Sequence, residues 1–160
     1  MGKEPRWART RPVAGARASV RLTLLAVGKL RDPWVAQGCA EYSTRLRPRL
    51  PVEIIELKND AGLAAKLPPR YLRWVLDERG DQPTSRELAA KLAQAMRTGA
   101  PGIALCIGGP DGHSEQLRSS ADYLLGLSRL TLPHRLARLI ALEQIYRAVS
   151  ILDGSPYHRD

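Results

Sequence analysis

The chain has 160 residues, of which 44% are hydrophobic and 26% are charged, and its formal net charge is +9. This size and composition are those of one globular domain, and they exclude a membrane-spanning or low-complexity protein. The excess of positive charge favours a polyanionic partner, nucleic acid before a membrane surface, although a merely basic surface explains the charge alone equally well.

Part of this charge lies at the amino terminus. Residues 1–20 contain five basic side chains and one acidic side chain, and they show no apolar periodicity. We expect a disordered arm here, followed by a single domain at residues 21–160. The segment has no apolar core of signal-peptide length, so we expect a cytoplasmic protein. Its arginines also fit a transit peptide or translation from an upstream start codon.

The two cysteines carry little chemical signal. Cys39 and Cys106 both fall in apolar, periodic segments. This placement is typical of small buried hydrophobic residues in a reducing compartment. We therefore expect neither a disulfide nor a metal site.

The first half of the chain predicts three strands and a helix. Residues 22–27 form a short apolar run typical of a strand that is buried on both faces. Asp32 and Pro33 have the residue types of a helix start, and the helix is expected to end at Pro48. Residues 52–57 and 71–76 predict two further strands, with a turn expected at 77–80.

The second half continues the alternation. Thr84 and Glu87 predict a capping box for a helix that ends at Gly99. Residues 103–107 predict another fully buried strand. The remaining expected elements are a short helix capped by Ser114, a last strand within 123–132, and a long helix from Pro133 to about Leu152.

Alternating strands and helices predict an α/β fold with a mainly parallel sheet. One connection fits poorly. Parallel strands need a crossover of about a dozen or more residues, normally helical, but only residues 59–70 join the second and third strands, and Pro68 and Pro69 cannot lie inside a helix. Either this crossover is minimal or the two strands are not neighbours.

Candidate functional residues cluster in the last third of the chain. Gly108 and Gly109 follow a buried strand and would let a ligand approach the backbone, although a plain tight turn explains them about as well. The segment lacks the pattern of dinucleotide or nucleoside-triphosphate loops. His134 begins the last helix, and the tail combines Tyr157, His158 and Arg159. Each feature by itself is explained at least as well by an ordinary surface or terminus.

The order of six motifs is more specific than any one of them. It resembles the RlmH family of SPOUT-class methyltransferases over residues 21–160, with the arm left outside. The motifs are V-G-K (27–29), L-D-E-R-G (76–80), I-G-G-P-D-G (107–112), L-S-R-L-T-L-P-H (127–134), L-E-Q-I-Y-R-A (142–148) and P-Y-H-R (156–159). Compared with the family, the connection at 59–70 is shortened.

The resemblance implies a SPOUT α/β-knot fold, with a trefoil knot at the carboxyl end, in an obligate homodimer. It implies methylation of N3 of pseudouridine 1915, in helix 69 of the 23S ribosomal RNA of the large subunit, on the assembled ribosome. S-adenosyl-L-methionine is the implied cofactor. The implied cofactor-binding residues are Leu76, Gly108, Gly109, Leu127, Ser128, Arg129, Leu130, Thr131, Leu132 and Pro133.

Catalytic roles follow as hypotheses from the same resemblance. His158 or Tyr157 would take the N3 proton, Arg147 and Arg159 would position phosphate or the uracil face, and His134 would hold the cofactor loop. One subunit would donate its tail to the pocket of the other. Two alternatives remain: a nonenzymatic basic RNA-binding module, and a SPOUT methyltransferase that acts on another RNA such as transfer RNA.

Overall fold

The computed structural model describes residues 19–159, so the expected arm lies almost entirely outside the described residues. Strands and helices alternate along this part of the chain. In order they are β1 (Arg21–Val27), α1 (Pro33–Leu46), β2 (Val52–Leu57), α2 (Asp60–Ala65), β3 (Leu72–Asp81), α3 (Ser85–Arg97), β4 (Gly102–Ile107), α4 (Glu115–Ser119), β5 (Tyr123–Leu125) and α5 (His134–Leu152).

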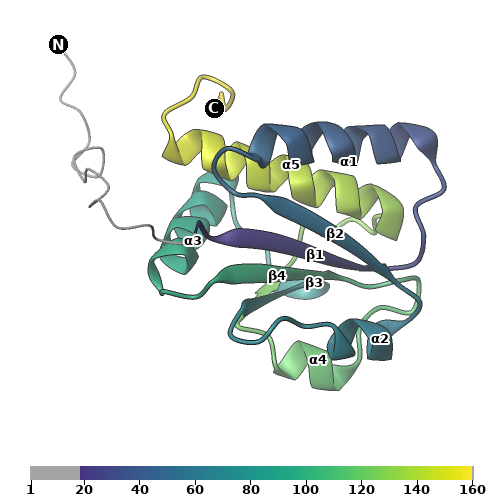
Figure 1. Ribbon diagram of the computed structural model, residues 1–160. Coiled ribbons are helices and arrows are strands. Elements are labelled where there is room, and N and C mark those ends of the chain that lie inside the picture. The colour runs from purple at the N-terminus through teal and green to yellow at the C-terminus, as the bar shows by residue number, and fades with distance from the viewer. Residues whose placement is uncertain (1–18, 160) are drawn as a thin grey trace, which may run out of the picture.

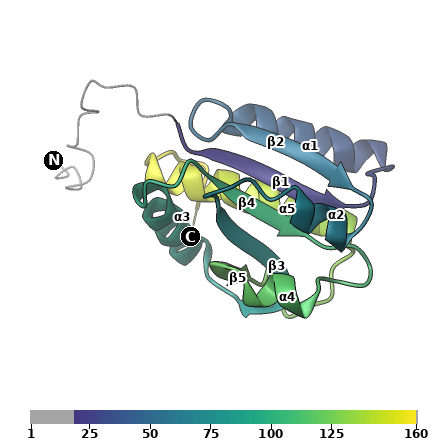
Figure 2. The ribbon, with the colours of Figure 1, turned by 60° about the horizontal axis from the view of Figure 1, so that its bottom comes forward.

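The strands form one sheet in the order β2-β1-β4-β3-β5, and every pairing is parallel. Helices cover both faces (Figure 1). Helices α1, α3 and α5 pack together on one face, and the short helices α2 and α4 lie on the other, which Figure 2 brings forward. The expected α/β class with a parallel sheet is therefore confirmed.

Two hydrophobic cores follow from this layering. The larger lies between the sheet and α1, α3 and α5, and the smaller joins the sheet to α2 and α4 through Leu63 and Leu117. Strand β4 is buried at every position because it lies inside both layers. Cys39 and Cys106 are buried free thiols, one in each core, as expected. Within residues 19–159, we find no helix with the length and apolar character of a membrane span.

The poorly fitting connection is explained by the strand order. Strands β2 and β3 are not neighbours, because β1 and β4 lie between them. The connection crosses the sheet with α2, a helix of only six residues, whose first N–H groups are capped by Asn59. The Asn59 Oδ1 atom accepts a hydrogen bond from the Gly62 N–H at 2.8 Å. The second of the two expected alternatives is the one observed.

The turn expected at 77–80 is wrong. Strand β3 continues to Asp81, and its pairing with β5 shifts register between Leu76 and Asp81. The Gly126 N–H donates to the Asp81 carbonyl at 2.7 Å, so β5 stays attached beyond the irregularity. The turn-like residues at 77–80 therefore form an irregularity of the β-bulge type within the strand, and the chain does not reverse direction there.

The caps of α3 and α4 follow their sequence signals. Thr84 and Glu87 form both hydrogen bonds of the capping box at the start of α3. Ser114 accepts a hydrogen bond from the Leu117 N–H and so caps α4. Helix α5 begins immediately after Pro133 and ends at Leu152, as expected.

Two glycines allow the end of β3 and the chain after β5 to cross in close contact. A Cβ atom at Gly80 would lie 2.6 Å from both the Leu124 carbonyl oxygen and the Leu125 carbonyl carbon. A Cβ atom at Gly126 would lie 3.0 Å from the Gly80 carbonyl oxygen. Because backbone atoms cannot move aside as a flexible side chain can, this crossing requires glycine.

We expect Gly80→Ala to destabilise the domain by roughly 1–3 kcal/mol, the usual cost of an inserted methyl group that has no room. Urea unfolding followed by circular dichroism measures this change. Gly62→Ala in α2 is the matched control, because its added Cβ would meet only the Asn59 side chain, at 3.3 Å. Equal stability of the Gly80→Ala variant and the wild type would contradict the close crossing.

Candidate functional site

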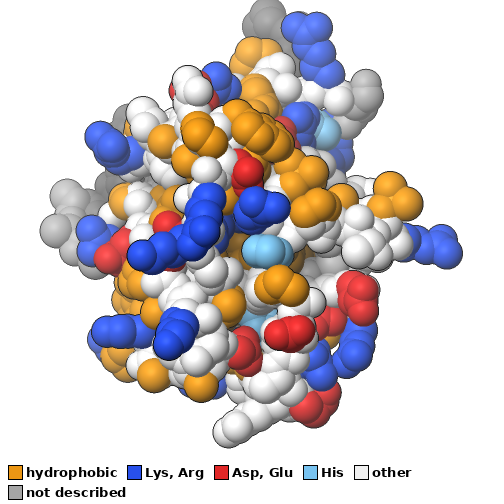
Figure 3. Space-filling model, turned by 90° about the vertical axis from the view of Figure 1, so that its right-hand side faces the viewer, with side chains coloured by type: hydrophobic (Ala, Val, Ile, Leu, Met, Phe, Trp, Pro, Cys, Tyr) orange, Lys and Arg blue, Asp and Glu red, His pale blue; other side chains and the backbone are white. Residues whose placement is uncertain are grey.

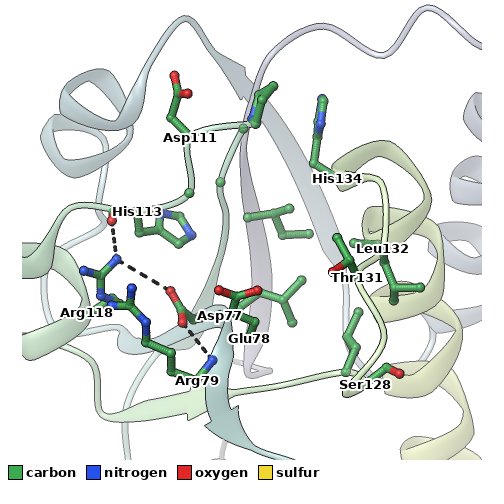
Figure 4. A pocket seen from close by; sticks show the side chains of 18 of the residues that line it. Asp77, Glu78, Arg79, Asp111, His113, Arg118, Ser128, Thr131, Leu132 and His134 are labelled. Atoms are coloured by element: carbon green, nitrogen blue, oxygen red, sulfur yellow. Dashed lines mark hydrogen bonds and ion pairs between the residues drawn. The ribbon is translucent and has the colours of Figure 1, made fainter.

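A pocket of about 330 Å³ opens at the carboxyl ends of the strands. Ligands of open parallel sheets bind at this edge. Figure 3 faces the edge and shows histidine side chains among hydrophobic, acidic and basic ones. Three segments form the walls (Figure 4): the end of β3, the β4–α4 loop and the loop between β5 and α5. The lining includes Leu76, Asp77, Glu78, Arg79, Ile107, Gly108, Gly109, Asp111, His113, Arg118, Leu127, Ser128, Leu130, Thr131, Leu132 and His134.

The glycine-rich loop after β4 brings backbone to the pocket surface. A Cβ atom at Gly109 would lie 3.0 Å from Val27 Cγ1, so a larger residue would push the loop away from β1. Gly112 has a positive φ of 70° and its N–H donates to the Gly109 carbonyl at 3.0 Å. The loop therefore forms a tight turn without bulky side chains at its glycines, which lets a ligand approach the backbone.

His113 lies at the end of this loop and connects it to α2 through Asp60. Its Nδ1 lies 2.7 Å from Asp60 Oδ1 and its Nε2 lies 3.3 Å from the Cys106 carbonyl oxygen. The second carboxylate oxygen of Asp60 accepts the Ser114 N–H at 2.9 Å. Burial of Asp60 opposes its ionisation, but the hydrogen bonds from Ser114 and His113 outweigh this effect and hold the pKa of Asp60 below its usual value.

A second clamp joins the same loop to β3. Arg118 donates to the His113 carbonyl and forms ion pairs with Glu115 at 2.7 Å and Asp77 at 3.8 Å. In Figure 4, Asp77 and Arg118 point toward one another below the pocket. The Asp77 side chain is 9% exposed and also accepts the Arg79 N–H at 2.9 Å. These contacts hold two walls of the pocket together.

The third wall is the loop that leads into α5. Five of the predicted cofactor residues line the pocket here: Leu127, Ser128, Leu130, Thr131 and Leu132. The Ser128 hydroxyl accepts the Leu130 N–H at 3.0 Å, which turns the loop and leaves Leu130 77% exposed. Arg129 and Pro133 belong to the same loop but are not among the lining residues.

His134 also lines the pocket, on the side opposite His113 (Figure 4). Burial lowers the pKa of His134 below its usual value, and the nearby positive charges of Arg135 and Arg138 lower it further. A neutral imidazole is therefore favoured at pH 7, which can accept as well as donate a hydrogen bond at the pocket rim.

The predicted catalytic tail is packed against α5 and α1. The Tyr157 hydroxyl donates to Glu143 Oε1 at 3.0 Å and lies 3.2 Å from the Tyr42 hydroxyl. Arg147 forms an ion pair with Glu143 at 2.6 Å, and its NH1 lies 3.3 Å from His158 Nδ1. Burial raises the pKa of Tyr157 above its ordinary value, and its hydrogen bonds to Tyr42 and Glu143 raise it further.

These tail residues do not reach the pocket of their own chain. Arg147 lies thirteen residues after His134 on α5, a separation of about 20 Å along a helix. Figure 1 shows the tail beside the end of α5 that is remote from the carboxyl edge of the sheet. The predicted residues thus form two groups: the cofactor residues with His134, and Arg147 with Tyr157 and His158. Arg159 is exposed at the end of the described chain.

Several residues of the site were missed by the sequence interpretation. His113 follows the glycine motif directly, and a titratable residue at the end of such a loop was the available signal. Asp60 lies 53 positions earlier in the chain, and nothing in the sequence links it to His113. Arg138 is only 2% exposed and donates to the Gly28 carbonyl at 3.1 Å, a burial that an arginine on a helix does not signal in the sequence.

Comparisons with known proteins agree with this geometry. The family model described as "Predicted SPOUT methyltransferase" matches residues 20–158. A protein of Geobacter metallireducens named Ribosomal RNA large subunit methyltransferase H is 43% identical over 152 residues, covering 87% of this chain and 99% of the relative. A protein of the same name from Laribacter hongkongensis is 43% identical over 157 residues, covering 88% of this chain and 100% of the relative.

Solved structures give the same fold at much lower identity. The crystal structure described as a probable methyltransferase from Bordetella pertussis superposes with a TM-score of 0.58 at 14% identity. It covers 82% of this chain and 96% of the other. At this identity the likeness concerns the fold alone.

We expect Asp60→Asn to lower both the stability of the domain and its affinity for a ligand in the pocket. Loss of charge-assisted hydrogen bonds to His113 and Ser114 should cost about 1–3 kcal/mol in urea unfolding. Asp122→Asn is the matched control, because Asp122 also accepts a backbone N–H, from Arg73 at 2.7 Å, but Arg73 does not line the pocket, whereas the Asp60 partner His113 does. Calorimetric titration with S-adenosylmethionine should show weaker binding for Asp60→Asn alone.

The effect of Asp60→Asn should depend on pH. Because the folded-state pKa of Asp60 is depressed, its contribution is complete above the unfolded pKa of about 3.9 and is lost as the pH falls through the folded-state pKa. The stability difference from the wild type should be constant between about pH 6 and 8 and should shrink below about pH 4. A difference that grows toward acid pH would contradict the role of the Asp60 carboxylate.

Proposed function

Because the chain belongs to the SPOUT methyltransferase family, we propose that it methylates N3 of a pseudouridine in helix 69 of the large-subunit ribosomal RNA. The observation that carries this proposal is the pocket at the carboxyl edge, whose lining contains the family's cofactor motifs in three converging segments. The relatives named Ribosomal RNA large subunit methyltransferase H support the substrate class. We further propose that the protein acts in the cytoplasm, on the assembled ribosome.

The lining of the pocket offers the groups that S-adenosylmethionine would contact. Leu76, Ile107 and Leu132 supply apolar surface, and the glycine loop presents backbone groups that can contact adenine and the methionyl part. Glu78 adds a carboxylate to the lining, which favours a cationic sulfonium, while the Asp77 carboxylate is ion-paired with Arg118. When bound, the cofactor supplies an electrophilic methyl group, and the protein must align the acceptor nitrogen with it.

A trefoil knot and a homodimer are part of the proposal. The crossing at Gly80 and Gly126 supports the knot, because the chain after β5 passes against the end of β3 before α5 begins. The distance along α5 supports the dimer, because a tail that lies about 20 Å from its own pocket can complete the pocket of a second chain.

In this arrangement His158 takes the N3 proton, and Arg147 and Arg159 position phosphate or the uracil face. The raised pKa of Tyr157 favours the protonated phenol, which makes it a hydrogen-bond donor and leaves the base role to His158. An arginine cannot accept a hydrogen bond, so the Arg147 contact occupies the lone pair on His158 Nδ1. For His158 Nδ1 to take the N3 proton, this contact with Arg147 must be released.

Two measurements separate this function from its alternatives. Calorimetric titration with S-adenosylmethionine should show binding, whereas a nonenzymatic RNA-binding module would show none. Methyl transfer should occur to ribosomes from a strain that lacks the modification. Transfer to transfer RNA, with none to ribosomes or large-subunit RNA, would place the chain with the SPOUT enzymes of another RNA.

Replacing His158 and Arg159 together by Ala should abolish methyl transfer and leave cofactor binding unchanged, because both residues lie outside the pocket of their own chain. Radiolabelled transfer and calorimetry measure the two properties. Wild-type activity of the double variant would remove these roles.

A mixed dimer tests whether the tail acts across subunits. Gly109→Val should abolish cofactor binding because its side chain would collide with Val27. When the Gly109→Val chain is assembled with the His158→Ala, Arg159→Ala chain, mixed dimers form. In each mixed dimer the second chain supplies an intact pocket and the first chain supplies an intact tail. Activity should recover to about a quarter of wild type for random pairing of a symmetric dimer. Two individually inactive chains that stay inactive when mixed would indicate a site within one chain.

A further inference from the structure

Two large hydrophobic side chains are exposed within residues 19–159: Trp34 at 63% and Leu130 at 77%. Leu130 lines the pocket already described. Trp34 lies in the first turn of α1, directly after the β1–α1 loop, and its neighbour Val35 points into the core. A tryptophan exposed to this degree forgoes the favourable burial of its ring, so it is a candidate contact for a partner.

The start of α1, where Trp34 lies, is tied to the pocket end of α5. Arg135 NH1 lies 2.7 Å from Asp32 Oδ2, which ties the start of α1 to the start of α5. His134, the residue before Arg135, lines the pocket. The Asp32 side chain makes no capping hydrogen bond to α1, so this carboxylate serves the link between the helices.

The β1–α1 loop, which precedes Trp34, is held by contacts with α5 and β2. Arg138 donates to the Gly28 carbonyl at 3.1 Å and lies 3.5 Å from Glu56 Oε2. The same Glu56 oxygen accepts the Leu30 N–H at 2.6 Å. These contacts order the loop from both ends, so the exposed ring is presented without a large cost in conformational entropy.

The charge around the ring is positive. Lys29 and Arg31 are exposed on the loop, and Arg135 is exposed on α5. The two carboxylates that hold this loop already have partners. Asp32 forms an ion pair with Arg135, and Glu56 accepts the Leu30 N–H and forms an ion pair with Arg138. An exposed aromatic ring among cations is the combination that binds single-stranded nucleic acid, because bases stack on the ring and phosphates pair with the cations.

We propose that Trp34 is a stacking platform for an unpaired base of the RNA substrate, next to the target nucleotide, with Lys29 and Arg31 on the adjoining phosphates. The proposal rests on the proposed function and deepens it, by naming a surface outside the pocket that selects a single-stranded RNA loop. A second copy of this chain is the competing occupant of the ring. That occupant lacks the charge complementarity, because the surface of every copy around Trp34 is equally basic.

The test compares Trp34→Ala with Trp34→Phe in the full-length chain, using ribosomes from a strain that lacks the modification. For Trp34→Ala we expect the KM for ribosomes to rise by roughly 10-fold or more, the loss that follows from one base stack. The kcat, the affinity for S-adenosylmethionine and the sedimentation coefficient should stay within about twofold of wild type. Trp34→Phe should restore most of the ribosome KM because it keeps a ring.

Two outcomes would overturn the proposal. An unchanged ribosome KM for Trp34→Ala would show that no base stacks there. A loss of self-association in sedimentation would show that the ring is covered by a second copy. Failure of the proposed function gives a different result, because the wild-type chain itself would then not methylate ribosomes.

Discussion

The pocket depends on the crossing of two backbones at Gly80 and Gly126. The bulged end of β3 and the chain leaving β5 pass so closely that a Cβ atom has no room at Gly80 and would be tightly crowded at Gly126. The segment before this crossing supplies Leu76 and Asp77, and the segment after it supplies the loop from Leu127 onward. Two of the three pocket walls therefore diverge from one point, and their separation is set by backbone contact.

Two partly buried clusters of charged residues, one on each face of the sheet, hold the loops around the pocket. On the face of α2, Asp60 fastens the glycine loop through His113. On the face of α5, Arg138 fastens the β1–α1 loop, with its Nε buried and without a hydrogen-bond partner among the described residues. Buried charges cost desolvation energy, so such contacts are weak sources of net stability. They are better explained as devices that keep loops in one conformation.

Local patterns predicted the elements well, and long-range pairing explains what they missed. The caps at Thr84 and Ser114 depend on residues three positions away, so the sequence was sufficient to identify them. The turn expected at 77–80 failed because β5, more than forty residues later, holds that segment in the sheet. The motif order selected segments that the structure brings together around one pocket, but the Asp60–His113 pair joins elements that no local spacing relates.

The tail has a further consequence for how the enzyme works in the cell. In a lone chain, Glu143 and Tyr42 satisfy Tyr157, and Arg147 contacts His158, so the proposed acid–base groups are occupied by their own helix. If pockets are completed by a second chain, turnover depends on protein concentration as well as on substrate. Freshly translated chains would then remain inactive at low abundance and would gain activity only as dimers accumulate.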